Sequence, residues 1–321
     1  MSAVALTAGC GQTPDSRPYP DGDITLIVPA EAGETTDTVA RAVAPCLAGK
    51  LGGTVAVRNQ PGQDGVLGNR ALLDAEPDGR TLMISSVGST VVTPLLPPKK
   101  DYGYDDFRFL GVVHSAPVVL FTAANSPVDS AGTLLRTAKA DGPPVTVANR
   151  GDKTVEGFTL WHLNSLAKTR LEPAPVDSDA EILRTVVAGS HTAGLATLTP
   201  ELLAAITSGQ VRLLASGGHR RPEYLPEVPT LYEAVGRKFS DAVPDLVVDT
   251  AFSARSDIGD AKSSTLSSTL SQCLSTDDVK RGIGAEFVPA GQGEPSTQRE
   301  RYRKLQSAVL LGLDMAEIEG R

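Results

Sequence analysis

Short apolar runs alternate along most of the chain with segments in which apolar residues recur every three or four positions. The apolar runs predict strands at residues 24–28, 54–58, 81–85, 145–148, 171–176, 192–196 and 211–215. The periodic segments predict helices at residues 36–51, 66–75, 130–140, 154–167, 179–188, 200–208, 263–274 and 279–283. Alternating strands and helices are typical of a mainly parallel sheet with covering helices, so we expect an α/β fold.

Two β-prone stretches interrupt this alternation. Residues 109–123 hold two apolar runs with no helix between them, and residues 246–252 are again apolar and β-branched. Both stretches suit strands that cross between two lobes. We therefore expect a discontinuous first lobe of residues 19–116 plus 241–315, and a second lobe of residues 117–240 inserted into it.

The two ends of the chain read as segments outside the fold. Residues 1–11 are small and apolar and include Cys10 after Ala-Gly, like the tail of a bacterial lipoprotein signal in which Cys10 is lipidated. The alternative is an unstructured leader with a chance cysteine. If Cys10 is lipidated, residues 1–18 are a leader remnant and tether. Residues 316–321 end in Ile-Glu-Gly-Arg and are a possible cloning scar.

Composition narrows the function classes. The formal net charge of −8, without a Lys/Arg-rich run, argues against nucleic-acid binding, and 4% aromatic residues disfavour base stacking. No apolar stretch reaches the ~18 residues of a membrane span. With Cys10 lipidated, Cys46 and Cys273 remain either as a disulfide in an oxidising compartment or as two separately buried thiols.

The segment from residue 24 to residue 37 carries the candidate chemistry. An apolar strand runs into a loop with Pro29 and Gly33, and a helix opens at Thr35, Thr36 and Asp37. This geometry directs unpaired backbone N–H groups and the positive end of a helix dipole beyond the strand end. Ligands of open α/β sheets bind at that edge, so the segment predicts half of an anion pocket.

Four groups of residues, in this order along the chain, resemble a known family. They are Tyr19-Pro20 with Leu26-Ile27-Val28-Pro29, Gly33, Asp37 and Arg41; Asn59-Gln60-Pro61-Gly62 with Gly65 and Gly68; Pro77-Asp78-Gly79-Arg80-Thr81-Leu82; and Val211–Ala215 with Arg221, Leu225-Pro226-Glu227-Val228-Pro229-Thr230 and Glu233. The chain resembles the Bug-type receptors of tripartite tricarboxylate transporters. This resemblance implies an extracytoplasmic solute-binding protein with a two-lobed, clamshell, type II-like periplasmic-binding-protein fold and two crossing strands. It also implies a small carboxylate ligand and membrane permease subunits as partners. We further expect a monomer attached to the membrane only through lipidated Cys10, with no cofactor, metal or catalytic residue.

The chain departs from the family where the ligand should bind. Glu34 follows Gly33 where the family has a second glycine, and Ala30 replaces a large apolar residue. The sequence Asn149 to Thr154 replaces a Gly- and Ser-rich loop, and Val176-Asp177-Ser178 replaces a Tyr-Lys-Gly turn. These differences leave the ligand open among di- and tricarboxylates, amino acids and aromatic acids.

The candidate site draws one loop from each lobe. The first lobe contributes Ala30, Glu31, Ala32, Gly33, Thr35, Thr36 and Asp37, with Ser86 and Ser89, and the second contributes Asn149, Arg150, Gly151, Lys153, Thr154 and Asp177. Arg150 can clamp a carboxylate with two parallel N–H bonds or be a solvated loop charge. Asp37 can shape its loop or be a helix-cap residue, and the Ser86–Ser89 stretch can be a plain turn. Asp152 and Asp177 can pair with a ligand's amino group or neutralise Arg150 and Lys153.

Two other function classes compete with transport. The sequence contains no nucleophile-elbow, zinc-protease, paired Cys-x-x-Cys or phosphate-loop motif, and its four histidines stand far apart, so nothing positive supports a hydrolase or transferase. A clamshell that signals to a membrane receptor is the other alternative, and no residue excludes it.

Overall fold

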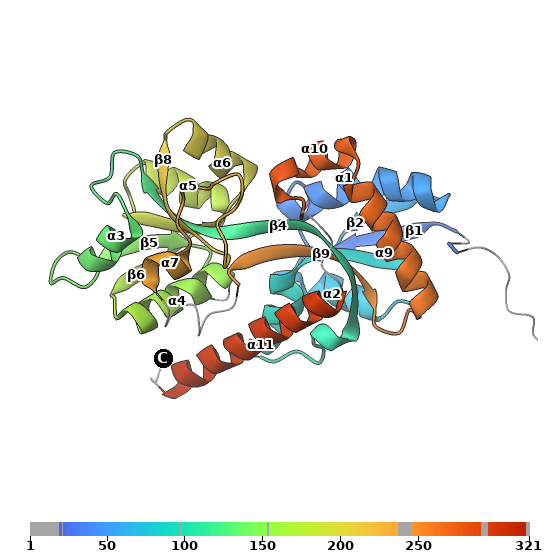
Figure 1. The fold of residues 1–321 in the computed structure, drawn as a ribbon. Coiled ribbons are helices and arrows are strands. Elements are labelled where there is room, and N and C mark those ends of the chain that lie inside the picture. The colour runs from blue at the N-terminus through green and yellow to red at the C-terminus, as the bar shows by residue number, and fades with distance from the viewer. Residues whose placement is uncertain are drawn as a thin grey trace, which may run out of the picture.

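The computed structural model describes residues 19–20, 22–96, 98–152, 154–236, 245–289 and 295–318. The leader with Cys10, and Lys153 of the candidate site, lie outside the described residues. The structure has two α/β halves joined by two strands, β4 (Phe107–Ala123) and β9 (Val247–Arg255) (Figure 1). The strands follow the order β2-β1-β3-β9-β4-β7-β5-β6, with β8 also paired to β4. The sheet is mixed rather than mainly parallel, because β4 and β9 run antiparallel to their neighbours.

The first half contains the N-terminal strands and helices together with two late helices. Its elements are β1 (Ile24–Val28), α1 (Thr35–Leu51), β2 (Val55–Asn59), α2 (Val66–Leu73), β3 (Thr81–Ser86), α9 (Asp260–Leu274) and α10 (Asp277–Ile283). Strand β1 pairs in parallel with β2 and β3, so the carboxyl ends of all three strands meet at one edge. That edge carries the loop that leads into α1.

The second half repeats the same kind of layering. Its elements are α3 (Ala131–Thr137), β5 (Val145–Asn149), α4 (Val155–Ala167), β6 (Leu171–Pro175), α5 (Asp179–Val187), β7 (Ala193–Thr197), α6 (Pro200–Thr207), β8 (Val211–Ser216) and α7 (Leu231–Val235). Strand β5 is parallel to β6 and β7. The loops after β5 and β6 therefore leave the sheet at one edge, where α4 and α5 begin.

The crossing strands are held together by close backbone contact. A Cβ atom on Gly217, just after β8, would lie 1.9 Å from the carbonyl oxygen of Leu246, which precedes β9. The N–H of Gly217 donates to the carbonyl oxygen of Val118 in β4 at 2.6 Å, and the N–H of Val118 donates to that of Leu246 at 3.0 Å. Glycine is therefore required at 217 because three backbone segments meet there.

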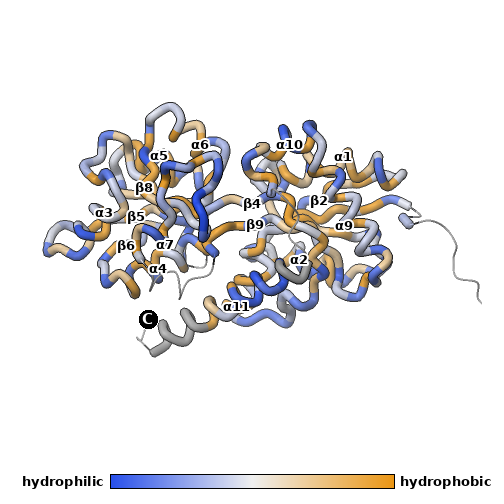
Figure 2. Tube along the Cα trace, in the orientation of Figure 1, coloured by the Kyte–Doolittle hydropathy of each residue, from blue (hydrophilic) through white to orange (hydrophobic). Residues whose placement is uncertain are grey.

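Three clusters of buried side chains form the core. One cluster continues through β4, from Leu110 in the first half to Phe121 in the second. Figure 2 shows hydrophobic residues along the strands inside both halves and hydrophilic residues on the outer loops. A disulfide joins Cys46 of α1 to Cys273 of α9, with the two Cα atoms 5.7 Å apart, so the first of the two alternatives for these cysteines is the one observed.

Helix α11 (Pro295–Ile318) was not predicted, and it extends into the segment set aside as a possible scar. It packs on the first half through buried Tyr302, Leu305 and Val309. Its Arg301 pairs with the carboxylate of Asp249 in β9 at 2.9 Å, so the helix is also tied to a crossing strand (Figure 1).

Within the residues that the structure describes, no helix combines the length and apolar character needed to cross a membrane.

Candidate functional site

The loop between β1 and α1 is organised by Asp37. Its carboxylate accepts hydrogen bonds from the backbone N–H of Gly33, from Nε of Arg41 and from Nδ2 of Asn59, each at 2.9 Å. Asn59 also donates to the carbonyl oxygen of Ala30 at 3.1 Å. Asp37 is only 3% exposed, so the side chain shapes the loop from beneath, which is the role that the sequence suggested for it.

The contacts of Asp37 stabilise its charged form. Burial acts to raise its pKa, but the hydrogen bonds from Arg41, Gly33 and Asn59 lower the pKa below its usual value. A carboxylate with a lowered pKa stabilises the fold at pH values above its unfolded pKa, and that contribution is lost as the pH falls through the folded pKa.

Replacing Asp37 with asparagine should therefore destabilise the protein and disorder the loop. We expect the Asp37→Asn variant to lose about 2–3 kcal/mol of unfolding free energy at pH 7, since charge-assisted hydrogen bonds to a buried group are lost. The difference from wild type should shrink as the pH falls below about 4. Urea unfolding at both pH values measures it, with Asp141→Asn as a control because Asp141 is 97% exposed. Equal stability of Asp37→Asn and wild type at pH 7 would contradict this role.

The exposed part of this loop leads directly into the start of α1. Glu31, Ala32, Gly33, Glu34 and Thr35 are exposed, Thr36 is half-buried and Ala30 is buried. Glu34 stands at the N-cap position of α1 but makes no side-chain cap hydrogen bond. The backbone N–H groups of Thr35, Thr36 and Asp37 consequently have no acceptor among the described residues.

Two glycines bring α2 against this loop. A Cβ on Gly65 would lie 2.6 Å from Cβ of Ser89, and a Cβ on Gly68 would lie 2.8 Å from Cβ of Pro29. Gly65 also has a positive φ of 89°. The glycine spacing that supported the family resemblance thus lets α2 pack directly on the loop after β1 and on the turn after β3.

The serine side chains of the turn after β3 form hydrogen bonds within the turn itself. The hydroxyl of Ser89 donates to the carbonyl oxygen of Ser86 at 3.0 Å, and the N–H of Ser89 donates to Oγ of Ser86 at 3.3 Å. Asn69 of α2 supports the turn through a 2.8 Å bond to the carbonyl oxygen of Ser89. Ser86 and Ser89 therefore lie at the predicted edge, but their observed bonds are those of a structured turn.

In the second half, Asn149 and Thr154 fix the loop between β5 and α4. Asn149 is fully buried, and its Oδ1 accepts from the N–H of Gly151 at 2.7 Å. Thr154 caps α4 by accepting from the N–H of Gly157 at 3.1 Å and donates to the carbonyl oxygen of Gly151 at 2.8 Å. Arg150 is exposed on this loop and makes no hydrogen bond or ion pair with any described residue. Asn149 and Thr154 hold the loop, and among its described residues Arg150 and Asp152 are exposed charges.

Two acidic residues that the sequence analysis missed lie at the starts of the helices that follow the second-half loops. Glu156, in the first turn of α4, is buried, and Asp179 begins α5. The pKa of Asp179 is raised to about 6, chiefly by burial and then by the charge of Glu156, while the charge of Arg150 opposes the rise and that of Glu34 adds to it. The predicted partners Asp152 and Asp177 are both exposed. Acids in the first turn of a helix are ordinarily interpreted as dipole partners, which is why their sequence positions gave no signal.

The loops from the two halves face each other. Glu34 of the first half acts electrostatically on Asp179 of the second. On another side of the same junction, Phe158 of α4 packs against the core cluster of the first half that contains Val87 and Val91. The charges at the starts of α1 and α5 are therefore near enough to act on each other.

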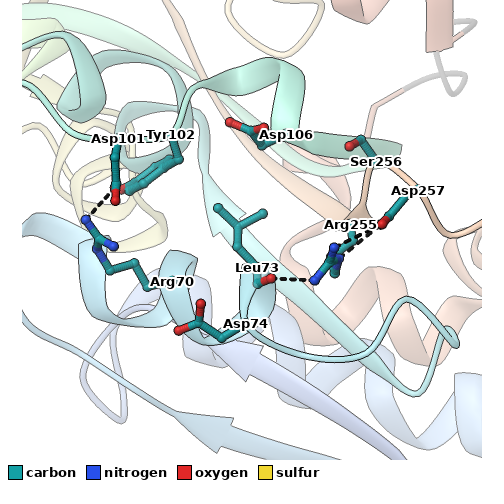
Figure 3. Close-up of a pocket in the computed structure, with 9 residues that line it drawn as sticks. All are labelled: Arg70, Leu73, Asp74, Asp101, Tyr102, Asp106, Arg255, Ser256 and Asp257. Carbon is teal, nitrogen blue, oxygen red and sulfur yellow. Dashed lines mark hydrogen bonds and ion pairs between the residues drawn. The ribbon is translucent and has the colours of Figure 1, made fainter.

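A separate cavity of about 290 Å³ lies elsewhere in the first half (Figure 3). It sits near Arg255 at the end of β9, and β9 runs antiparallel to β3, so this cavity is at the opposite end of β3 from Ser86. Both arginines of its lining are already paired, Arg70 with Asp101 and Arg255 with Asp257 at 2.9 Å, and Asp74 and Asp106 add two further carboxylates. It is distinct from the candidate site.

The histidines lie outside the site chemistry. His114 of β4 stacks on Phe287 with ring centroids 5.2 Å apart, and burial lowers its pKa to about 4. His162 is buried between Phe158 and Trp161, as expected for a packing residue. The described part of the chain contains no group of three or more His, Cys, Asp or Glu side chains that could hold a metal ion.

Comparison with known proteins shows which family and which solved structures this chain is similar to. The model of the family described as "Tripartite tricarboxylate transporter family receptor" matches residues 39–252. BugT of Bordetella pertussis is 31% identical over 231 residues, which cover 71% of this chain and 70% of BugT. MatC of Rhodopseudomonas palustris with bound malate has a TM-score of 0.72 at 23% identity, covering 91% of this chain and 100% of that one. An R. palustris protein solved with adipate has a TM-score of 0.76 at 20% identity, covering 94% of this chain and 99% of that one. The two-lobed α/β fold expected from the sequence is confirmed.

Proposed function

Because the chain belongs to the tripartite tricarboxylate transporter receptor family, we propose that it captures a small carboxylate between its two halves. The loop 30–36 and the loop 149–154 would hold the ligand. Members of this family and the neighbouring structures are solute-binding proteins rather than enzymes. Malate and adipate in two structural neighbours support a carboxylate as the ligand class.

The observation that carries this proposal is the unpartnered start of α1. Its first-turn N–H groups have no acceptor among the described residues, and Asp37 and Asn59 hold the preceding loop in place. A carboxylate offers about four acceptor sites and one negative charge, which suits such donors. Arg150, which is exposed on the loop of the second half, would add a bidentate contact.

The wider biology follows from the family and remains part of the proposal. The receptor would act outside the cytoplasm as a monomer, anchored through lipidated Cys10, and deliver its ligand to membrane permease subunits. The Cys46–Cys273 disulfide supports an oxidising compartment. Residues 19–116 plus 241–315 and residues 117–240 would be the two bodies that close over the ligand through β4 and β9.

A thermal-shift screen of di- and tricarboxylates, amino acids and aromatic acids tests the proposal. A ligand that binds only the folded protein raises its stability by about 2.7 kcal/mol at a hundredfold excess over Kd. We expect Arg150→Ala to weaken the best carboxylate about tenfold, since one charge-assisted contact is removed, without lowering the unliganded Tm. Arg170→Ala is the matched control, because Arg170 is 77% exposed and distant in the fold from the start of α4. A flat response to the whole panel would overturn the carboxylate assignment, and unchanged affinity of Arg150→Ala would remove Arg150 from the site.

A further inference from the structure

The pairing of the strands shows where the two halves bend most easily. Strand β3 stops pairing with β9 at Thr250, and β7 and β8 pair with β4 only from residue 118 onward. Between these limits residues 115–116 of β4 pair with residues 248–249 of β9, and within the described residues no third strand joins them. A ribbon of two strands is held by fewer bonds than a wider sheet. These four residues are the hinge ribbon of the molecule.

Asp249 places a buried carboxylate in the hinge ribbon. The residue is 1% exposed, and its Oδ1 accepts from the hydroxyl of Ser115 at 2.7 Å. Its Oδ2 pairs with Nη1 of Arg301 in α11 at 2.9 Å. Burial raises the pKa of Asp249, and the charge of Arg301 and the hydroxyl of Ser115 oppose that rise. Because a buried carboxylate without a cation is unfavourable, the hinge ribbon depends on α11 for its charge balance.

Arg301 connects the hinge ribbon to both halves. Its helix is fixed to the first half, since Tyr302 and Leu305 belong to a core cluster there. Its Nη2 lies 3.5 Å from Oδ2 of Asp245. Asp245 directly precedes Leu246, which is buried in the core cluster of the second half. Figure 1 shows α11 running below the crossing strands, from the first half toward the second. Arg301 therefore lies between a helix of the first half and the edge of the second.

The neighbouring arginines of α11 have different partners. Arg303 pairs with Glu300 of the same helix at 2.8 Å, and Arg299 pairs with Asp105 of the first half. The side chains of Arg299 and Arg303 are 53% and 60% exposed, and exposed ion pairs contribute little to stability. Only the pair of Arg301 and Asp249 involves a fully buried carboxylate, and only this pair reaches the hinge ribbon within the described residues.

We propose that Arg301, Asp249 and Asp245 form a tether that resists bending of the hinge ribbon and sets how far apart the two halves lie without ligand. This inference rests on the proposed closure of the two halves, but not on which carboxylate is bound. Movement of the second half away from α11 separates Asp245 from Arg301, and bending of the ribbon separates Arg301 from Asp249. Either movement leaves a partly buried charge without its partner, which is unfavourable. The tether therefore favours the observed arrangement of the halves over others.

Pulsed electron spin resonance on the ligand-free full chain tests the tether, because it measures the distribution of distances between two labels. One spin label is placed on each half, at Asp141→Cys before β5 and at Asp278→Cys in α10, where the native side chains are 97% and 90% exposed. Cys10→Ser is included in every sample so that no other free thiol is labelled, since Cys46 and Cys273 form a disulfide.

Three variants are compared with the parent. Arg301→Gln/Asp249→Asn removes both charges of the buried pair together, and Asp245→Asn removes only the contact with the second half. Both variants should populate a second interhalf distance, and we expect this population to rise about tenfold in the double variant because a charge-assisted contact is lost. Arg303→Gln is the matched control on the same helix, and it should keep the parent distribution.

An unchanged distance distribution in both Asp245→Asn and the double variant would make the contacts of Arg301 purely structural and overturn the inference. The same change in Arg303→Gln would also overturn it, because loosening of α11 as a whole would then be the cause. If the double variant does not fold, Asp245→Asn decides alone, since it leaves Arg301 paired with Asp249. No ligand is present in this measurement, so failure of every carboxylate to bind would refute the proposed function without changing this result.

Discussion

Removal of the Cys46–Cys273 disulfide should lower the unfolding free energy by about 3–5 kcal/mol. The two cysteines are 227 positions apart in a chain of 321 residues, so the bond closes most of the chain into one loop and restricts the unfolded state strongly. The bond also joins α1 to α9, which come from the two separate sections of the first half. Cys273 is fully buried, so the cross-link lies within the core rather than at its surface.

The double variant Cys46→Ala/Cys273→Ala isolates this effect. Urea unfolding is measured for the variant and for the wild type, each with and without reductant. The variant and the reduced wild type should both have a much lower unfolding free energy than the oxidised wild type. Reductant should have no effect on the variant, which controls for other actions of the reagent. Identical unfolding midpoints for oxidised wild type and the double variant would show that the bond does not stabilise the protein.

Much of the fold follows from local sequence patterns. The strand predicted at residues 24–28 is β1 (Ile24–Val28), and the helix predicted at residues 36–51 is α1 (Thr35–Leu51). These elements are predictable because apolar spacing alone decides which face is buried. The long crossing strand β4 was also predicted in large part, because residues 109–123 hold two apolar runs with no helix between them.

Helix α11 shows where local patterns fail. Its first turns carry Arg299, Arg301, Arg303 and Lys304, so charge dominates the pattern there. Only the spacing of Tyr302, Leu305 and Val309 marks a narrow apolar stripe, and the partner of that stripe is a distant part of the chain. Tertiary packing therefore defines this helix more than its own sequence does.

The residues that shape the loops of the candidate site could be predicted from the sequence, but the charged surroundings of Asp179 could not. Asp37 and Thr154 act within a few residues of their own positions, so their roles can be read from sequence. The environment of Asp179 depends on Glu156 and Glu34, which are far away along the chain. Only the assembled chain lets these charges act on Asp179.

A methyl group at position 157 should disable the second-half loop without removing any polar side chain. A Cβ on Gly157 would lie 2.1 Å from the carbonyl oxygen of Gly151 and 2.6 Å from Cα of Asp152. Both contacts are with backbone, so the loop itself must move by about 1 Å to restore ordinary van der Waals contact. That movement breaks the bonds by which Thr154 holds Gly151 and displaces Arg150.

We expect Gly157→Ala to destabilise the protein by about 1–3 kcal/mol and to weaken carboxylate binding about a hundredfold, because more than one ligand contact is displaced together. Gly49→Ala is the matched control. Gly49 lies in helix α1, and a Cβ at this position would meet no neighbouring atom within 4 Å, so alanine there should be neutral or slightly stabilising. Urea unfolding and calorimetry on both variants measure the two effects.

The two readouts of Gly157→Ala separate packing from function. A helix glycine normally costs stability relative to alanine, so propensity alone would make Gly157→Ala more stable. A stable variant with full affinity would mean that the loop tolerates the methyl group and that residues 150–154 do not contact the ligand. Lost affinity in a variant that still folds would instead place this loop, or the Arg150 side chain that it carries, at the ligand, since the substitution adds only one apolar carbon and removes no charge.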